Sequence, residues 1–146
     1  MSKPTLTEQL LNNILQLRKL MLQAADVAHE EKAATMLQLF ALNFLHDRPG
    51  TKLSSLGASL HLSKSSSTQL IERLEKMGFL KRAVDKDDKR IIHLSLRLKG
   101  ERKLSVLRRK VIHKMNRIIS KVPESDLKEL VRIQSDLIKT LEKERK

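Results

Sequence analysis

The chain has 146 residues, 40% of them hydrophobic, which is typical of one globular domain and not of a disordered chain. It has no cysteine, which excludes disulfides, thiolate metal sites and thiol redox sensing within the chain, and no apolar run approaches the ~18 residues of a membrane span. The start of the chain lacks the pattern of a secretory signal, so we expect a cytoplasmic protein without membrane contact.

The net charge of +13 is unevenly distributed along the chain. Residues 1–50 and 123–146 are each neutral, residues 51–100 carry +6 and residues 101–122 carry +7. Lysine and arginine release counterions from nucleic-acid phosphates, so a polyanion is the expected partner. An acidic membrane surface would accept the same charge, but the absence of tryptophan and tyrosine argues against membrane anchoring and against single-strand binding by stacking.

Two helices are predicted at the start of the chain. Thr5 and Glu8 have the spacing of a capping box, and apolar residues then recur every three or four positions to about residue 29. Further leucines lie off this stripe, so the helix must bury more than one face, part of it against a second subunit. A second helix is predicted from about residue 32 to 46, followed by a turn at residues 47–50.

A short helix and a longer one follow. Thr51 or Lys52 is expected to open the short helix, in which Gly57 allows close packing against another helix. Backbone amides at its start, together with Ser54 or Lys52, are candidates for holding a phosphate. Ser63 is the predicted N-cap of the longer helix.

The longer helix has one apolar and one polar face. Leu70, Leu74 and Met77 share the apolar face, and Gly78 is placed to end the helix. The opposite face carries short polar or charged side chains: Ser65, Ser66, Thr68, Gln69, Glu72 and Lys76. Such side chains suit a major groove, where they hydrogen-bond base edges and phosphates. Alone, the pattern also fits an ordinary surface helix.

A charged hairpin comes next. Residues 79–84 and 91–96 are predicted strands, the second with clean alternation of its apolar positions. The six residues between them, 85–90, are all charged and must be exposed. Arg90 on a narrow exposed tip can enter a minor groove, where the negative potential attracts guanidinium. The alternative is a simple solvated turn.

The chain is predicted to end in two more helices. Apolar residues recur at helical spacing through residues 98–122, and Pro123 marks the start of a last helix that continues to about residue 143. A monomer of this size does not need three long apolar helices at its ends, whereas a twofold dimer does. The alternative is a monomer with a helical cap.

The hairpin and its preceding helix resemble the MarR family (multiple antibiotic resistance regulators). The family's wing pattern, Asp-x-x-Asp-x-Arg, corresponds to Asp85, Asp88 and Arg90, and a Lys-Gly pair opens the next helix at residues 99–100. The start Leu-Ser-Lys-Ser at residues 62–65 also matches. Ser67 stands where the family usually has a small apolar residue, which predicts a looser or rotated helix.

Two other positions depart from the family's usual residues. Arg97 stands where the family usually has threonine, and His61 stands in the turn where it often has glycine.

The resemblance implies a mainly α fold with a small β-hairpin: a winged helix-turn-helix with long N- and C-terminal dimerisation helices. One domain would cover residues 1–146, with dimerisation helices at about 5–29 and 98–143 and a DNA-binding lobe at about 32–97. The first helix and the last two would interleave with those of a second subunit. A small, often aromatic anion would bind between the two lobes as an effector.

The expected function is a sequence-specific, double-stranded DNA-binding transcription regulator, acting as a homodimeric repressor on a pseudo-palindromic operator. The residues expected to contact DNA are Lys52, Ser54, Lys64, Ser65, Ser66, Thr68, Gln69, Arg73, Lys86, Lys89 and Arg90. Asp88 is expected to orient Arg90 or Arg73. The alternatives are a sequence-independent architectural DNA-binding protein and a winged helix that binds an acidic protein partner.

Motifs for catalysis are absent. The chain has no Gly-rich phosphate loop, no Gly-x-Ser-x-Gly and no His-Glu-x-x-His, so we expect neither an enzyme nor a cofactor. Its five histidines are scattered, and no metal site is expected. A minor alternative is a zinc site in which His29, His113 and an acid such as Glu30 meet in the fold.

Overall fold

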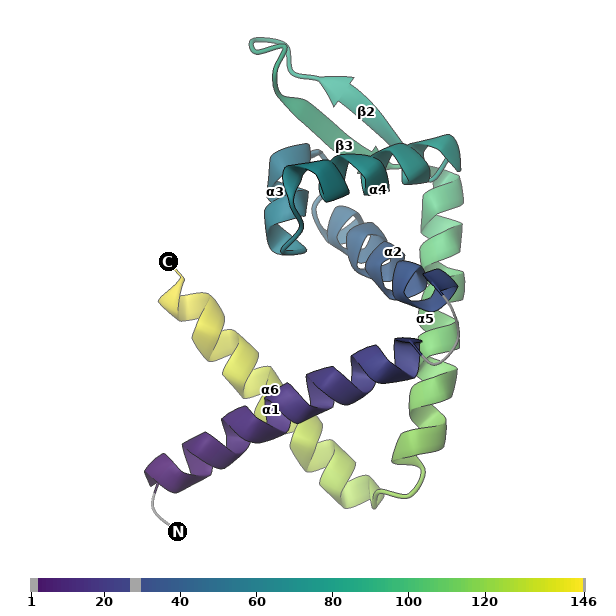
Figure 1. The fold of residues 1–146 in the computed structure, drawn as a ribbon. Coiled ribbons are helices and arrows are strands. Elements are labelled where there is room, and N and C mark those ends of the chain that lie inside the picture. The colour runs from purple at the N-terminus through teal and green to yellow at the C-terminus, as the bar shows by residue number, and fades with distance from the viewer. Residues whose placement is uncertain (1–2, 27–29, 146) are drawn as a thin grey trace. The chain divides into compact units, whose positions relative to one another are not determined.

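The computed structural model describes residues 3–26 and 30–145 (Figure 1). The chain divides into two compact units, residues 1–107 and residues 108–146. The first unit holds the sheet and the core, and the second holds the end of one long helix and all of the last helix.

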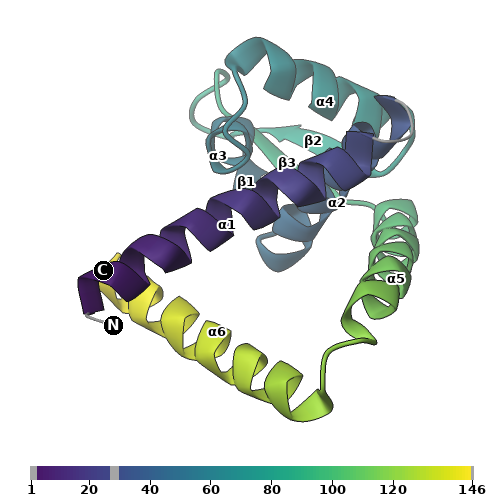
Figure 2. The same cartoon turned by 60° about the horizontal axis from the view of Figure 1, so that its bottom comes forward.

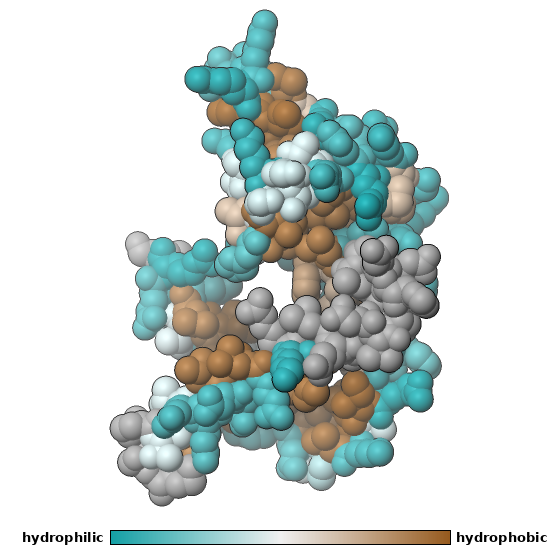
Figure 3. Space-filling view, in the orientation of Figure 1, coloured by the Kyte–Doolittle hydropathy of each residue, from teal (hydrophilic) through white to brown (hydrophobic). Residues whose placement is uncertain are grey.

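The first two helices form as predicted. α1 spans Lys3–Asp26 and α2 spans Glu30–Asp47. The predicted end of α1 near residue 29 lies outside the described residues. Leucines and an isoleucine on α1 are about half exposed in the single chain, which leaves an apolar surface on this helix (Figure 3).

The sheet has one more strand than the predicted hairpin. β2 (Leu80–Val84) and β3 (Ile92–Leu96) pair antiparallel, and β1 (Thr51–Lys52) pairs with the other edge of β3, giving the order β1-β3-β2 (Figure 2). Lys52 is also the N-cap residue of the helix that begins at Leu53, so the expectation that Thr51 or Lys52 opens this helix is confirmed for Lys52, and the strand is the part that was not predicted. Gly50, in a left-handed conformation at φ 76°, donates its amide to the carbonyl of Leu94 and aligns this segment with β3.

The helix-turn-helix follows the sequence closely. α3 covers Leu53–Ser59 and α4 covers Lys64–Lys76. The Ser63 hydroxyl accepts the amide of Ser66 at 3.1 Å, which confirms the predicted N-cap. Gly78 has φ 75° and ends α4 as expected, since a side chain there would strain the backbone.

The turn between α3 and α4 contains an unusual backbone conformation. His61 has φ 53°, in the left-handed region that favours glycine. This geometry gives a physical reason for the glycine that the MarR family often has here.

The core of the first unit lies between α2, the helix-turn-helix and the sheet. Seven large side chains are almost completely buried there: Leu42, Leu45, Leu56, Ile71, Leu74, Leu80 and Leu94. They come from α2, α3, α4, β2 and β3. This shared core holds α4 and the hairpin in one rigid unit.

The long helix α5 spans Leu98–Ile119 and α6 spans Glu124–Glu144. The start of α5 packs against the residue that precedes β2. A Cβ atom at Gly100 would overlap the backbone of Phe79, so only glycine allows this close approach. Leu104 and Leu107 join the core of the first unit. No described residue of α6 is buried in the single chain.

Among the described residues, no helix is both long and apolar enough to cross a membrane.

Candidate nucleic-acid interface

The polar face of α4 is presented to solvent. Ser65, Ser66, Gln69 and Arg73 are exposed, and Thr68 is partly exposed with its hydroxyl donating to the carbonyl of Lys64 at 2.9 Å. The apolar face is anchored in the core through Leu70, Ile71 and Leu74. The packing therefore sets the rotation of α4 about its axis and leaves the predicted reading face outward.

Ser67 is buried on the core-facing side of α4, which does not support the rotated helix expected from this residue. Its side chain is only 4% exposed and faces the core, as the family's apolar residue would. The hydroxyl donates to the carbonyl of the N-cap residue Ser63 at 2.8 Å, so this buried hydroxyl has a hydrogen-bond partner within the same turn. Gly57 of α3 lies directly opposite, and its missing side chain makes room for the Ser67 hydroxyl.

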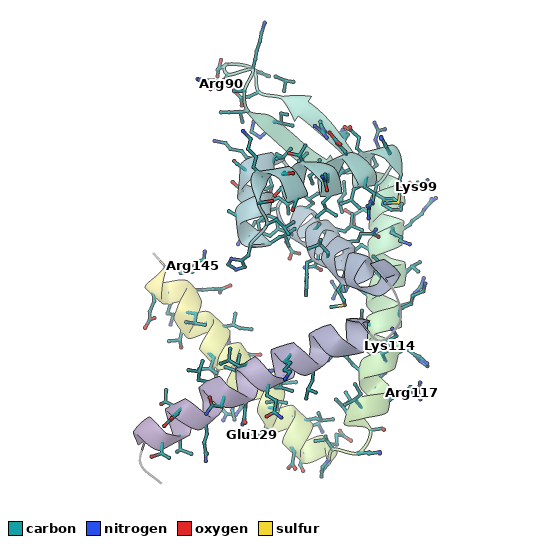
Figure 4. All side chains as sticks on the ribbon, in the orientation of Figure 1. Arg90, Lys99, Lys114, Arg117, Glu129 and Arg145 are labelled. Carbon is teal, nitrogen blue, oxygen red and sulfur yellow. The ribbon has the colours of Figure 1, made fainter. Side chains whose placement is uncertain are left out.

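The tip of the hairpin is held by two aspartates. Asp88 accepts from the backbone amide of Arg90 at 2.9 Å and from its guanidinium at 3.1 and 3.2 Å. This bidentate contact lowers the pKa of Asp88. The Arg90 side chain nevertheless remains 91% exposed, so it is oriented at the tip and open to a ligand (Figure 4).

Asp85 is the second aspartate that stabilises the hairpin tip. One carboxylate oxygen accepts the amides of Asp87 and Asp88 at 3.0 and 3.2 Å, and the other accepts the His93 Nε2 hydrogen at 2.7 Å. The His93 contact is the main reason that the pKa of Asp85 falls to about 2. Asp85, the first aspartate of the wing pattern, therefore stabilises the conformation of the hairpin tip.

His93 joins the hairpin to the turn before β1. Its Nδ1 lies 2.9 Å from the carbonyl oxygen of Gly50, and its Nε2 contacts Asp85. Both neighbours are acceptors, so both ring nitrogens must carry a hydrogen for both bonds to form, and the ring is then an imidazolium. The Asp85 contact, followed by that to Gly50, raises the pKa of His93.

An ion pair connects α4 with the hairpin. Arg82 of β2 has its Nε 3.3 Å from a carboxylate oxygen of Glu75, although this Nε is not aligned for a hydrogen bond. The contact ties the end of the recognition helix to the strand that leads to the tip. The two candidate reading elements are therefore positioned by the core, by this pair and by the His93 bridge.

The predicted residues fall into three groups, all in the first unit. One group lies at the start of α3, one on α4 and one on the hairpin tip (Figure 1). All are exposed except Thr68 and Asp88, which are partly exposed; the set comprises Lys52, Ser54, Lys64, Ser65, Ser66, Thr68, Gln69, Arg73, Lys86, Asp88, Lys89 and Arg90. Of the two arginines considered for Asp88, Arg90 is the one it contacts.

Sequence reasoning missed the structural roles of His93 and Asp85. The partner of His93 at Gly50 is 43 positions away in the chain, beyond the reach of any local pattern. In the sequence, Asp85 stands out only as part of the wing pattern. The available signal in the sequence was an aspartate before the tip together with a histidine on the returning strand.

A metal centre finds no support in the part of the chain that the structure describes. No group of three or more histidine, cysteine or acidic side chains gathers there. His29, a member of the alternative zinc set, lies outside the described residues.

Comparison with known proteins gives consistent results. Residues 34–92 match the sequence model of the MarR family. The chain is 29% identical over 119 residues to the HTH-type transcriptional repressor MdtR of Bacillus subtilis (strain 168), covering 80% of this chain and 76% of that protein.

Solved structures share the fold. A crystal structure of MarR aligns with a TM-score of 0.69 at 20% identity, covering 94% of this chain and 98% of that one. The PcaV transcriptional regulator from Streptomyces coelicolor, solved in complex with its natural ligand, aligns with a TM-score of 0.57 at 19% identity and covers 100% and 98%.

Proposed function

We propose that this chain is a DNA-binding transcriptional regulator of the MarR family and acts as a homodimeric repressor of a pseudo-palindromic operator. The observation that carries the proposal is the exposed Arg90, held in a bidentate contact by Asp88 at the hairpin tip beside an outward polar helix face. Such an arrangement can read two grooves of one duplex at once. We place the protein in the cytoplasm, with the DNA it binds.

In the proposed complex, α4 enters a major groove. Ser65 and Gln69 lie one turn apart on its exposed face, in position to reach base edges, while Lys64 and Arg73 contact phosphates. The buried Leu70 and Leu74 fix the rotation of the helix. At the start of α3, Lys52 and Ser54 are exposed and supply further contacts to the phosphate backbone of the DNA.

The wing reaches a minor groove. Arg90 is pre-oriented by Asp88, so less side-chain entropy is lost when it binds than for a free arginine. Lys86 and Lys89 on the same tip are exposed and neutralise phosphates. Asp88 acts through Arg90 and does not contact DNA, because a carboxylate beside phosphate is repelled.

Dimerisation is supported by the unburied apolar faces of the long helices. On α1, Leu6, Leu10 and Ile14 are 50%, 49% and 53% exposed, and on α6 Leu137 and Leu141 are 48% and 60% exposed in the single chain. Apolar surface of this extent is typical of an interface. Two identical subunits then present two recognition helices to half-sites about 34 Å apart.

A small anionic or aromatic effector is part of the proposal. The fold is shared with PcaV, whose structure contains its natural ligand. An effector would favour a conformation in which the two reading helices no longer match the half-site spacing.

The proposal is tested by selecting bound sequences from a random duplex library at about 150 mM salt, where nonspecific phosphate binding is weakened. We expect an inverted repeat, bound at least ~1000-fold more tightly than random duplex. Light scattering should give twice the chain mass of 16.8 kDa. Recovery of unenriched sequence would instead favour a sequence-independent architectural protein.

Arg90→Ala tests the wing directly. Each subunit should lose a groove contact of about 1–3 kcal/mol, so the dimer should lose about 2–6 kcal/mol and bind the operator at least about 30-fold more weakly. The matched control is Lys139→Ala, which removes one positive charge from an exposed position on α6. Equal operator affinities for the two variants would rule out the wing role.

A further inference from the structure

The second unit has a strongly basic helix segment that the operator-reading elements do not include. Between Arg108 and Val122 the chain has six basic residues and no acidic residue. The residues proposed to read DNA all belong to the first unit. This charge therefore has no role in the proposed operator complex.

Three of these cations form one stripe on α5. Lys110, Lys114 and Arg117 are spaced by four and three residues, which places them on one side of the helix. All three are exposed, and Lys114 and Arg117 project from the same side of α5 in Figure 4. We name these three residues the α5 cationic face.

The charge of this face is not neutralised within the described part of the chain. None of its three residues has a carboxylate within ion-pair distance there, and like charges at these spacings weaken a helix. The neighbouring α6 differs, since Arg132 contacts Glu129 and Asp136 and Lys128 contacts Glu124. An external anion would neutralise the positive charge of the α5 cationic face, as the carboxylates of α6 neutralise the cations of α6.

The spacing fits the backbone of duplex DNA. At 1.5 Å per residue, the three cations span about 10 Å of helix, with roughly 5 Å between one charge and the next. A DNA strand presents about one phosphate per 3.4 Å, so the two linear charge densities are similar. The second unit also contains no aromatic residue, which argues against insertion into a lipid surface.

Duplex DNA is also the polyanion that this chain meets. When the first unit binds DNA, the linked second unit experiences a high effective concentration of phosphate. We propose that the α5 cationic face is a second, sequence-independent binding surface for the duplex backbone, separate from the recognition helix and the wing. It adds to the proposed repressor function and does not depend on operator reading.

The test compares two triple variants with the same loss of charge. Lys110→Gln, Lys114→Gln and Arg117→Gln together remove the face, and Gln retains good helix propensity. The control carries Lys139→Gln, Lys143→Gln and Arg145→Gln, three exposed positions at the end of α6. Light scattering and circular dichroism should show both variants dimeric and helical like the unsubstituted chain.

Each protein is titrated with a random-sequence duplex and with a minimal operator duplex over a range of salt. On the random duplex, the face variant should lose about tenfold or more in affinity at 0.1 M salt, and its salt slope should fall by about 3 for each face in contact. The α6 control should stay within threefold. On the minimal operator, both variants should stay within threefold of the unsubstituted protein.

Arg90→Ala separates this inference from the proposed function. It should lose preference for the operator but keep binding to the random duplex, so failure of operator reading leaves the second surface testable. Equal losses for the two triple variants, or no loss for the face variant, would overturn the proposal. It would also be overturned if the face variant lost binding to vesicles containing about 30% phosphatidylserine but kept its binding to the duplex.

Discussion

The contact between Gly57 of α3 and Ser67 of α4 can be tested by a double-mutant cycle. A Cβ atom at Gly57 would overlap the Ser67 hydroxyl and lie 3.1 Å from the Ser67 Cβ. Overpacking of this kind typically costs about 1–3 kcal/mol, and the better helix propensity of alanine returns up to about 1 kcal/mol. Gly57→Ala should therefore lower the free energy of unfolding by about 1–2 kcal/mol.

Ser67→Ala alone should have little effect on stability. The Ser67 hydroxyl donates to the Ser63 carbonyl, but this carbonyl also accepts the amide of Ser67 at 2.9 Å. Removing the hydroxyl leaves no acceptor unsatisfied, so the change should stay within about 0.5 kcal/mol. In the double variant the overlap with Oγ is gone, and we expect about 1 kcal/mol of the Gly57→Ala cost to be recovered.

The assay is urea unfolding at one fixed protein concentration. Circular dichroism is the suitable probe, because the chain has no tryptophan or tyrosine for fluorescence. With a slope of about 2 kcal/mol per molar urea, a loss of about 1–2 kcal/mol moves the midpoint by roughly 0.5–1 M. An additive cycle, with a coupling energy below about 0.3 kcal/mol, would show that the two residues do not contact each other and would refute the reasoning.

Four further predictions concern stability. The bridge through His93 contributes fully below about pH 6.5 and is lost as pH rises through the raised pKa of His93, so the stability difference between the unsubstituted chain and His93→Gln should shrink above that pH in urea titrations. The contribution of Asp85 to stability has the opposite pH dependence: it is present above pH 3.8 and is lost as pH falls toward the lowered pKa of about 2. His61→Gly should raise stability by about 0.5–1 kcal/mol, since relief of left-handed strain exceeds the added unfolded-state entropy; a lower urea midpoint would contradict this. Leu94→Ala should cost about 2–5 kcal/mol because Leu94 is fully buried, whereas Leu98→Ala, at a position 67% exposed, should change the urea midpoint little.

Local sequence patterns determined most of the helices, their ends and the exposed hairpin tip of this protein. The Ser63 cap, the Gly78 stop and the helical periodicities of the flanking segments each depend on residues a few positions apart, and the structure places these elements where the patterns predict them. The exposed wing tip also follows from local composition, because six consecutive charges cannot be buried. Even the pairing of Asp88 with Arg90 joins residues only two positions apart.

Only the tertiary structure revealed the contacts between distant segments. The strand β1 forms because Gly50 turns the chain onto β3, and its two residues carry no strand period that a sequence could show. The same fold brings His93 between Gly50 and Asp85, and Ser67 over Gly57. Such contacts depend on which surfaces pack together, a property set by the whole core and not by the spacing of neighbouring residues.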